Sequence, residues 1–182
     1  MNRVYVFLAD GFEEIEGLTV VDLLRRAGID LVTVSVMGEK EINGAHQIKV
    51  LADTLIEEIT PDKGDMLVLP GGMPGTLHLR DCERLTGFLK TANEAESPIA
   101  AICAAPTVFG GLGFLKDKTA VCYPGMEEGL TGAKVSTEPV VTDGHITTSR
   151  GLGTAIAFAL RLISILKGEE KARAIGESIV YS

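Results

Sequence analysis

The chain has 182 residues, of which 46% are hydrophobic, with three cysteines and a formal net charge of -8. This length fits one domain with a buried core, and the negative charge argues against nonspecific binding to nucleic acids or acidic membranes. No apolar stretch reaches the ~18 residues of a membrane helix, and the N-terminal segment lacks the pattern of a signal peptide. We therefore expect a cytoplasmic protein with reduced thiols and with neither membrane nor nucleic-acid partners.

Short apolar runs alternate with helix-length segments along the chain. The predicted strands, apolar almost throughout as if buried on both faces, are residues 4–9, 30–37, 65–69 and 98–103. The predicted helices are residues 12–28, 81–96, the first part of 105–115, 153–168 and 169–180. An Asn43–Gly44 pair predicts a hairpin over residues 41–53, and Asp143–Gly144 joins two short strands predicted within residues 134–150.

The alternation of strands and helices predicts an α/β fold with a mainly parallel sheet that is covered on both faces. We expect a single domain over residues 1–182, since no linker, repeat or low-complexity segment interrupts the pattern. Sites in such sheets gather at the carboxyl ends of the strands. Three candidate segments fall there: Asp10–Gly11 with the acidic residues that follow, Pro70–Gly72, and Cys103.

Cys103 lies where a predicted strand ends and a predicted helix starts. The helix dipole favours the thiolate, Pro106 suits the first helical turn, and the N–H groups of Ala104 and Ala105 could face a developing oxyanion. This arrangement is similar to a nucleophile elbow without its glycines. The alternative is a small buried core residue, which is the usual role of a free cysteine.

Two other segments each admit a structural and a functional interpretation. Gly71 and Gly72 form either a tight turn that needs positive φ or a backbone N–H donor to an oxyanion. Glu13 and Glu14 are expected to face water and to stabilise the dipole of the first helix, whereas Glu16 lies closer to its buried side. A buried Glu16 would have a raised pKa and could share a proton with a thiolate, although most such carboxylates are solvated.

The remaining cysteines and histidines have no catalytic signature in the sequence. We expect His46, His78 and His145 to be structural or exposed. Cys122 is expected to be a buried residue at a strand end or, alternatively, a thiol that resolves or tunes Cys103. No set of ligand residues has metal spacing, and the glycine loops that bind phosphates and dinucleotides are missing from the sequence. We therefore expect neither a metal nor a cofactor.

Five ordered segments give the chain a resemblance to the DJ-one/ThiJ/PfpI superfamily. They are ADGFEEIE, VDLLRRAGI, LVLPGG, AAICAAP and TSRGLGTAIAFAL, and together they cover nearly the whole chain. The chain most resembles the bacterial, ThiJ-type branch that is related to the parkinsonism-associated protein deglycase. This resemblance implies a flavodoxin-like three-layer α/β/α sandwich and a homodimer.

The resemblance also implies an active site. In that site Cys103 is the reactive, oxidation-prone thiol, Glu16 is the acid bonded to it, and Gly72 and Ala104 supply backbone donors. It implies cofactor-free chemistry on small dicarbonyls such as methylglyoxal, or on glycated thiols and amines. Members of the superfamily are also described as chaperones and oxidative-stress sensors.

Two positions depart from the pattern of relatives. Animal members have a histidine near the nucleophile where this chain has Tyr123, which leaves Glu16 as the main proton carrier. Other branches have a histidine directly after the cysteine, where this chain has Ala104, so a peptidase with a Cys–His pair is not expected. The leading prediction is a glyoxalase- or deglycase-type enzyme in carbonyl and oxidative stress defence. The alternative is a stress sensor or chaperone whose Cys103 is oxidised to sulfinic acid without significant turnover.

Overall fold

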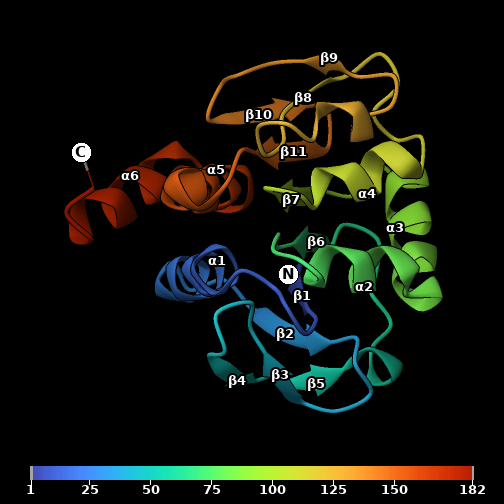
Figure 1. Ribbon diagram of the computed structural model, residues 1–182. Coiled ribbons are helices and arrows are strands. Elements are labelled where there is room, and N and C mark those ends of the chain that lie inside the picture. The colour runs from blue at the N-terminus through green and yellow to red at the C-terminus, as the bar shows by residue number, and fades with distance from the viewer. Residues whose placement is uncertain (1, 182) are drawn as a thin grey trace.

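The central feature of the molecule is a sheet that lies between two layers of helices (Figure 1). The computed structural model describes residues 2–181. From one edge to the other, the strands of the main sheet are β10 (Val140–Asp143), β11 (Ile146–Ser149), β7 (Ile99–Ile102), β6 (Met66–Leu69), β1 (Val4–Leu8), β2 (Leu31–Ser35) and β5 (Thr54–Leu55). All neighbours pair in parallel except β10 and β11, which form an antiparallel hairpin at one edge.

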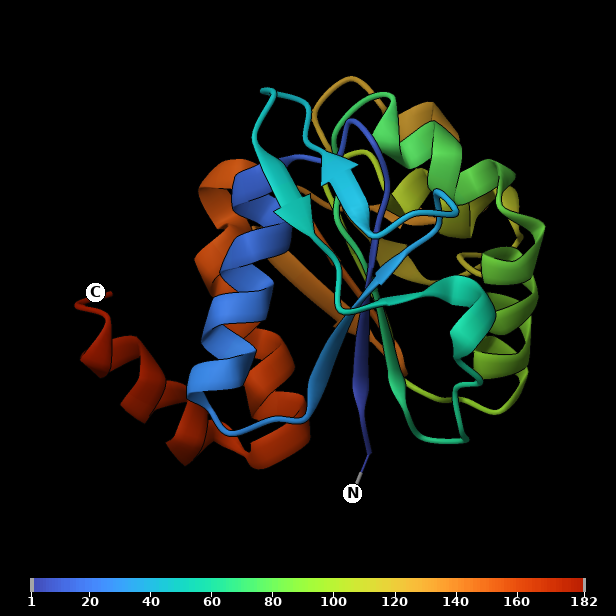
Figure 2. The same ribbon diagram turned by 90° about the horizontal axis from the view of Figure 1, so that it is seen from below.

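Helices cover both faces of this sheet (Figure 2). One layer contains α1 (Glu14–Arg26), α5 (Ala155–Lys167) and α6 (Glu169–Ser178), and the other contains α2 (Gly75–Asp81), α3 (Glu83–Glu94) and α4 (Pro106–Gly111). Strand β1 contributes side chains to the core on both faces of the sheet. Val4, Val6 and Leu8 pack with α1 and α5, and Tyr5 and Phe7 pack with the opposite layer. This alternation explains why a buried parallel strand is apolar at every position.

Shorter elements lie outside this frame. Two small sheets pair β3 (Glu41–Asn43) with β4 (Lys49–Leu51) and β8 (Thr119–Ala120) with β9 (Lys134–Val135). Three 3-10 helices lie at Ile56–Glu58, Glu127–Gly129 and Leu152–Thr154. The antiparallel pair of β3 and β4 confirms the predicted hairpin, and residues 44–48 form its loop.

The flavodoxin-like α/β fold class is confirmed, and the four predicted buried strands are adjacent in the sheet as β2, β1, β6 and β7. Helix α2 was not expected, because its buried face consists of Gly75, Thr76 and Leu79 and has little apolar periodicity. Strands β5, β8 and β9 were also missed as separate strands, because two residues are too few to show an alternating pattern.

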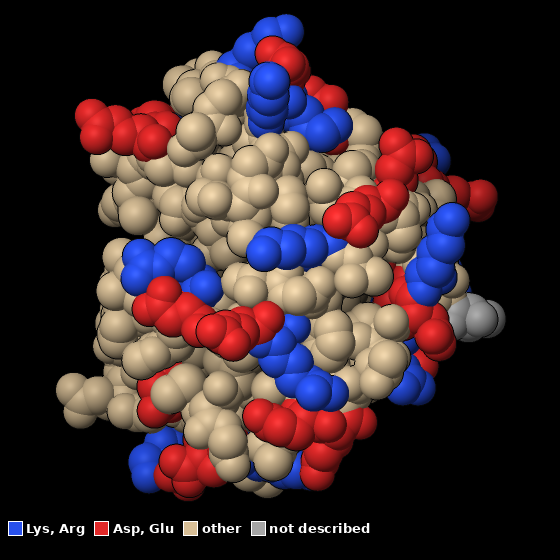
Figure 3. All heavy atoms as spheres, turned by 90° about the vertical axis from the view of Figure 1, so that its right-hand side faces the viewer, with Lys and Arg blue, Asp and Glu red and all other residues tan. Residues whose placement is uncertain are grey.

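The face of the molecule drawn in Figure 3 carries charged side chains of both signs. Figure 3 shows basic and acidic side chains interspersed over the face that includes α3, with neither sign dominating it. Within residues 2–181, no helix is long and apolar enough to cross a membrane. The three cysteines, Cys82, Cys103 and Cys122, are free.

Leu24 and Leu51 provide a matched test of how much the core layer stabilises the fold. Leu24 in α1 is 0% exposed, whereas Leu51 in β4 is 75% exposed. We expect Leu24→Ala to lower the free energy of unfolding by about 2–5 kcal/mol, because it leaves a cavity between α1 and the sheet. Leu51→Ala should change it by less than about 0.5 kcal/mol. Urea unfolding monitored by circular dichroism measures both, and similar losses would contradict this assignment of the core.

Candidate active site

Cys103 occupies a strained corner between β7 and α4. Its φ is 65°, in the left-handed region that residues other than glycine rarely adopt. The surrounding backbone holds this conformation from both sides. The N–H of Cys103 donates to the Ser149 carbonyl at 3.0 Å, and its carbonyl accepts from the Tyr123 N–H at 2.8 Å. Backbone strain that neighbouring hydrogen bonds maintain in this way is a common feature of functional sites.

Glu16 lies on the first turn of α1, is 1% exposed and contacts the Cys103 thiol through a hydrogen bond. Its Oε2 accepts the Gly71 N–H at 2.9 Å. The backbone N–H of Leu152 also donates to the carboxylate. A carboxylate that is removed from water needs such partners, and here they come from three different segments of the chain.

Gly71 permits the close approach of Glu16 and Cys103. A Cβ added at Gly71 would lie 2.5 Å from the Cβ of Cys103 and 2.6 Å from Oε2 of Glu16. No side chain fits in that space without displacing one of the two groups. The steric reason for a glycine at position 71 is therefore this close approach, since its φ is not among the positive values.

The proton balance of the site follows from burial. Burial raises the pKa of Glu16 to about 7, although the hydrogen bond from Cys103 acts in the opposite direction. Burial, followed by the charge of Glu16, raises the pKa of Cys103 to about 12. These directions favour a protonated Cys103 thiol beside Glu16, and they make Glu16 the group of this pair that titrates near neutral pH.

The helix dipole was expected to favour a Cys103 thiolate, and burial and Glu16 oppose it, because both raise the pKa of the thiol. Helix α4 has only 6 residues, and the charge of Glu16 lies next to the sulfur. The backbone N–H groups of Ala104 and Gly72 do lower the pKa of Cys103, but burial and Glu16 outweigh them. Gly72 and Ala104 were expected as oxyanion donors, and this role stays a prediction. Gly72 adopts the positive φ of 92° that its interpretation as a turn residue required.

Tyr123 and Cys122 lie in different surroundings although they are adjacent in sequence. The Tyr123 side chain is half exposed, and its Cδ2 would be 3.4 Å from a Cβ at Gly151, a position that is also near Oε1 of Glu16. Cys122 is buried in the hydrophobic cluster beneath α2, α3 and α4, whereas Cys103 packs against the opposite cluster. Burial raises the pKa of Cys122 to about 11. These surroundings fit a structural role better than that of a resolving thiol.

Glu14 contradicts the expectation that it faces water, because its side chain is 2% exposed. The loop between β3 and β4 folds over it and supplies N–H donors that the sequence of α1 does not reveal. Burial alone would raise the pKa of Glu14, but hydrogen bonds from His46 and Ile48 hold it below its ordinary value. Glu13 is also partly buried and caps α1, since its Oε2 accepts the Glu16 N–H at 2.8 Å.

Glu13, Glu14 and His46 offer ligand atoms that all lie within 4.8 Å of one another. Their spacing in the sequence did not indicate this cluster, because the loop of the β3–β4 hairpin brings His46 next to the two glutamates. The oxygens of Glu14 already accept hydrogen bonds from the loop, and Nδ1 of His46 is 2.8 Å from Oε2. These contacts account for the group without a metal ion.

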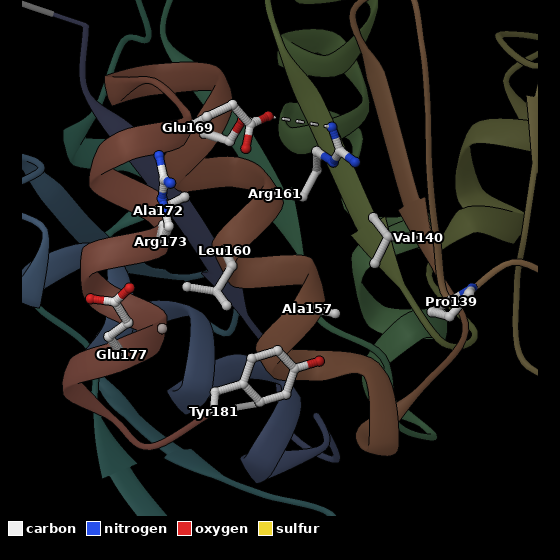
Figure 4. A pocket seen from close by; sticks show the side chains of 12 residues that line it. Pro139, Val140, Ala157, Leu160, Arg161, Glu169, Ala172, Arg173, Glu177 and Tyr181 are labelled. Carbon is white, nitrogen blue, oxygen red and sulfur yellow. Dashed lines mark hydrogen bonds and ion pairs between the residues drawn. The ribbon is translucent and has the colours of Figure 1, made fainter.

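A groove of about 590 Å³ lies away from Cys103, between α5, α6 and β10 (Figure 4). Figure 4 shows Arg161 directed toward Glu169 across it, with their nearest atoms 4.0 Å apart. None of the expected site residues lines this groove. The candidate active site remains the arrangement around Cys103 at the carboxyl ends of β6 and β7.

The raised pKa of Glu16 predicts a pH-dependent stability. Between about pH 4.5 and 7 the folded protein holds a proton that the unfolded chain has lost, so stability falls as pH rises through this window. Glu16→Gln should remove this slope and raise the free energy of unfolding at pH 8 by about 3 kcal/mol relative to wild type, with little difference at pH 4. Urea unfolding from pH 4 to 8 tests this, with the exposed Glu57→Gln as control. Parallel wild-type and Glu16→Gln curves would contradict it.

Comparison with known proteins supports this fold and identifies the family. The model of the DJ-1/PfpI family matches residues 2–165. Protein DJ-1 homolog B of Arabidopsis thaliana is 38% identical over 98% of this chain, which spans only 41% of that plant protein. Glutathione-independent glyoxalase DJR-1.2 of Caenorhabditis elegans is 30% identical over 90% of this chain and 87% of that protein. The structure of oxidized Toxoplasma gondii DJ-1 is 36% identical, with a TM-score of 0.93 over 100% of both chains. The chain therefore belongs to the DJ-1/PfpI family.

Proposed function

We propose that the protein is a cofactor-free enzyme that converts small α-oxoaldehydes into 2-hydroxy acids, with Cys103 as nucleophile. The observation that carries this proposal is the buried Glu16 carboxylate, which is hydrogen-bonded to the Cys103 thiol with two backbone N–H groups at the same sulfur. A base, a nucleophile and donors for a developing oxyanion are the parts that attack on a carbonyl carbon requires. The glyoxalase name of the Caenorhabditis elegans relative supports the same chemistry.

In the first step Cys103 attacks the aldehyde carbon while Glu16 removes the proton from Sγ. The C–S bond forms, the C=O electron pair moves to oxygen, and the N–H groups of Gly72 and Ala104 stabilise that oxyanion. Glu16 then returns the proton to the oxygen, which gives a neutral hemithioacetal. A carboxylate whose pKa is about 7 suits both the removal and the return of a proton at neutral pH.

The second stage transfers hydrogen between the two substrate carbons. Glu16 removes the C–H proton of the hemithioacetal to give an enediol, and reprotonation at the neighbouring carbon gives a 2-hydroxy thioester. Water then hydrolyses the thioester, which releases the 2-hydroxy acid and restores the Cys103 thiol. One carbon is oxidised and the other is reduced, so the sequence consumes water and needs no external oxidant.

Glycated thiols and amines present a related carbon, and we include them in the proposed substrate class. A hemithioacetal or hemiaminal of an α-oxoaldehyde already carries the hydroxyl that the first step would generate. Attack by Cys103 with departure of the original thiol or amine would give the same enzyme-bound intermediate. The proposed deglycase reaction therefore differs from the glyoxalase reaction only in its leaving group.

Lactate production from methylglyoxal tests the enzyme proposal. We expect Cys103→Ser and Glu16→Gln each to lower kcat/KM by at least about 100-fold, since one loses the nucleophile and the other the proton carrier. Cys82→Ser, which changes a free cysteine in another segment, should keep wild-type activity. An enzymatic assay of lactate measures all four proteins, and equal rates in wild type and both site variants would refute this mechanism.

A sensor function is the second candidate, and the hydrogen bond between Glu16 and Cys103 also favours it. Two equivalents of peroxide would convert the Cys103 thiol to sulfinic acid and release two waters, and Glu16 could bond the new S–O group. The solved Toxoplasma gondii relative is described as oxidized. In this alternative, oxidation changes a binding surface and turnover is negligible.

Intact-mass analysis after mild peroxide separates the two candidates. The sensor proposal predicts a selective gain of two oxygens at Cys103, with Cys82 and Cys122 unchanged and with no lactate from methylglyoxal. Glu16→Gln should slow formation of the sulfinic acid or make it less selective, since the buried bond to the product is altered. Indiscriminate oxidation of all three cysteines would rule out a sensor at this site.

The homodimer and the cytoplasmic location expected from the sequence stay predictions. Exposed apolar side chains support a homodimer in which α1 contributes to the interface. They include Ile15 and Leu18 on α1 and Ile156 on α5. Ile156 lines the same groove as Thr19 and Asp22 of α1, so these surfaces are adjacent.

A further inference from the structure

The loop between β3 and β4 is exposed, yet a buried carboxylate anchors it. Oε1 of Glu14 accepts the His46 N–H at 2.7 Å and the Ile48 N–H at 3.4 Å, while Oε2 lies 2.8 Å from Nδ1 of His46. A Cβ at Gly44 would clash with the Glu14 side chain, so the loop closes tightly over it. Hydrogen bonds to a buried charge are among the stronger ones in proteins.

The same loop is joined to the segment that leads from β1 into α1. The Gly11 N–H donates to the Asn43 carbonyl at 2.8 Å, and the Ala45 N–H donates to the Phe12 carbonyl at 2.8 Å. Residues 10–13 therefore lie between the loop on one side and Gly72 on the other. A Cβ at Gly72 would collide with backbone atoms of Gly11, Phe12 and Glu13.

This segment sets the direction of the Gly72 amide. The Glu13 N–H donates to the Gly71 carbonyl at 2.8 Å. In a planar trans peptide, the carbonyl of Gly71 and the N–H of Gly72 point in opposite directions. The bond from Glu13 thus fixes one end of the peptide group, and the other end carries the N–H that donates to Cys103.

We propose that Glu14 is a positioning residue that holds the hairpin loop against residues 10–13 and thereby aims the Gly72 N–H at the Cys103 sulfur. Glu14 does not touch the sulfur itself. It acts through the loop, the Glu13 N–H and the Gly71–Gly72 peptide group, in that order. The role in turnover rests on the proposed function, whereas the effect on the Gly72 amide and on the Cys103 thiol does not.

Amide hydrogen exchange, measured residue by residue by NMR, tests the structural part of this proposal. In Glu14→Ala we expect exchange at Ala45, His46 and Ile48 to accelerate, and exchange at the Glu13 and Gly72 amides to accelerate at least about tenfold as well. Glu14→Gln keeps an acceptor oxygen and should recover part of the protection. Faster exchange confined to the loop would show that Glu14 anchors the loop only, and would overturn the proposal.

The reactivity of Cys103 supplies a readout that does not need turnover. A misdirected Gly72 N–H raises the pKa of the thiol, so Glu14→Ala should slow alkylation of Cys103 by iodoacetamide and move its pH profile upward. The kcat for methylglyoxal should fall about tenfold with less than a twofold change in KM, a smaller loss than removal of a donor causes. Unchanged alkylation in both Glu14 variants would contradict the proposal even if wild type produces no lactate, an outcome that would refute only the proposed function.

Two control variants separate positioning from general destabilisation. Asp65 is also a buried carboxylate that accepts two backbone N–H groups, from Arg3 and Asp62, but it precedes the central strand β6, at the amino ends of the strands and away from Cys103. Asp65→Asn should lower stability and leave Cys103 alkylation and kcat unchanged. His46→Ala keeps the backbone N–H that Glu14 accepts but removes the ring at Oε2, so it should slow Cys103 alkylation less than Glu14→Ala does. An effect of Asp65→Asn on Cys103 equal to that of Glu14→Ala would overturn the positioning role.

Discussion

The hydrogen bond between Glu16 and Cys103 is the interaction on which the rest of the site depends. The Glu16 carboxylate in this contact is buried, and its burial raises its pKa to about 7. Gly71 makes this contact possible in two ways. It has no side chain that would separate Glu16 from Cys103, and its N–H donates to Oε2 of Glu16.

The frame that positions this contact was predictable from local patterns. The apolar runs became β1, β2, β6 and β7, and the carboxyl ends of β6 and β7 brought Gly72 and Cys103 together as a parallel sheet requires. Helix α1 was also predictable, and the place of Glu16 near its buried side follows from helical geometry. The family resemblance added the pairing of Glu16 with Cys103, which no spacing in the sequence reveals.

Features that depend on distant segments were not predictable in the same way. Glu14 was expected in water because its own helix gives it no partner, and its donors come from a hairpin more than 30 residues later. The thiolate was expected because a strand-to-helix corner suggests a dipole, whereas the pKa of Cys103 depends on burial and on a charge brought by another helix. The short helix α2 and the two-residue strands lack periodicity altogether.

The hairpin of β3 and β4 lies outside the main sheet, and its position affects how the protein unfolds. Elements of this kind open as separate cooperative units, with a free energy below that of global unfolding. Because the loop of this hairpin is bonded to residues 10–14, its local opening would loosen the segment that contacts Gly71 and Gly72 while the seven-stranded sheet stays intact. The heat tolerance of the proposed activity would then follow the local stability of an exposed hairpin rather than the melting temperature of the whole fold.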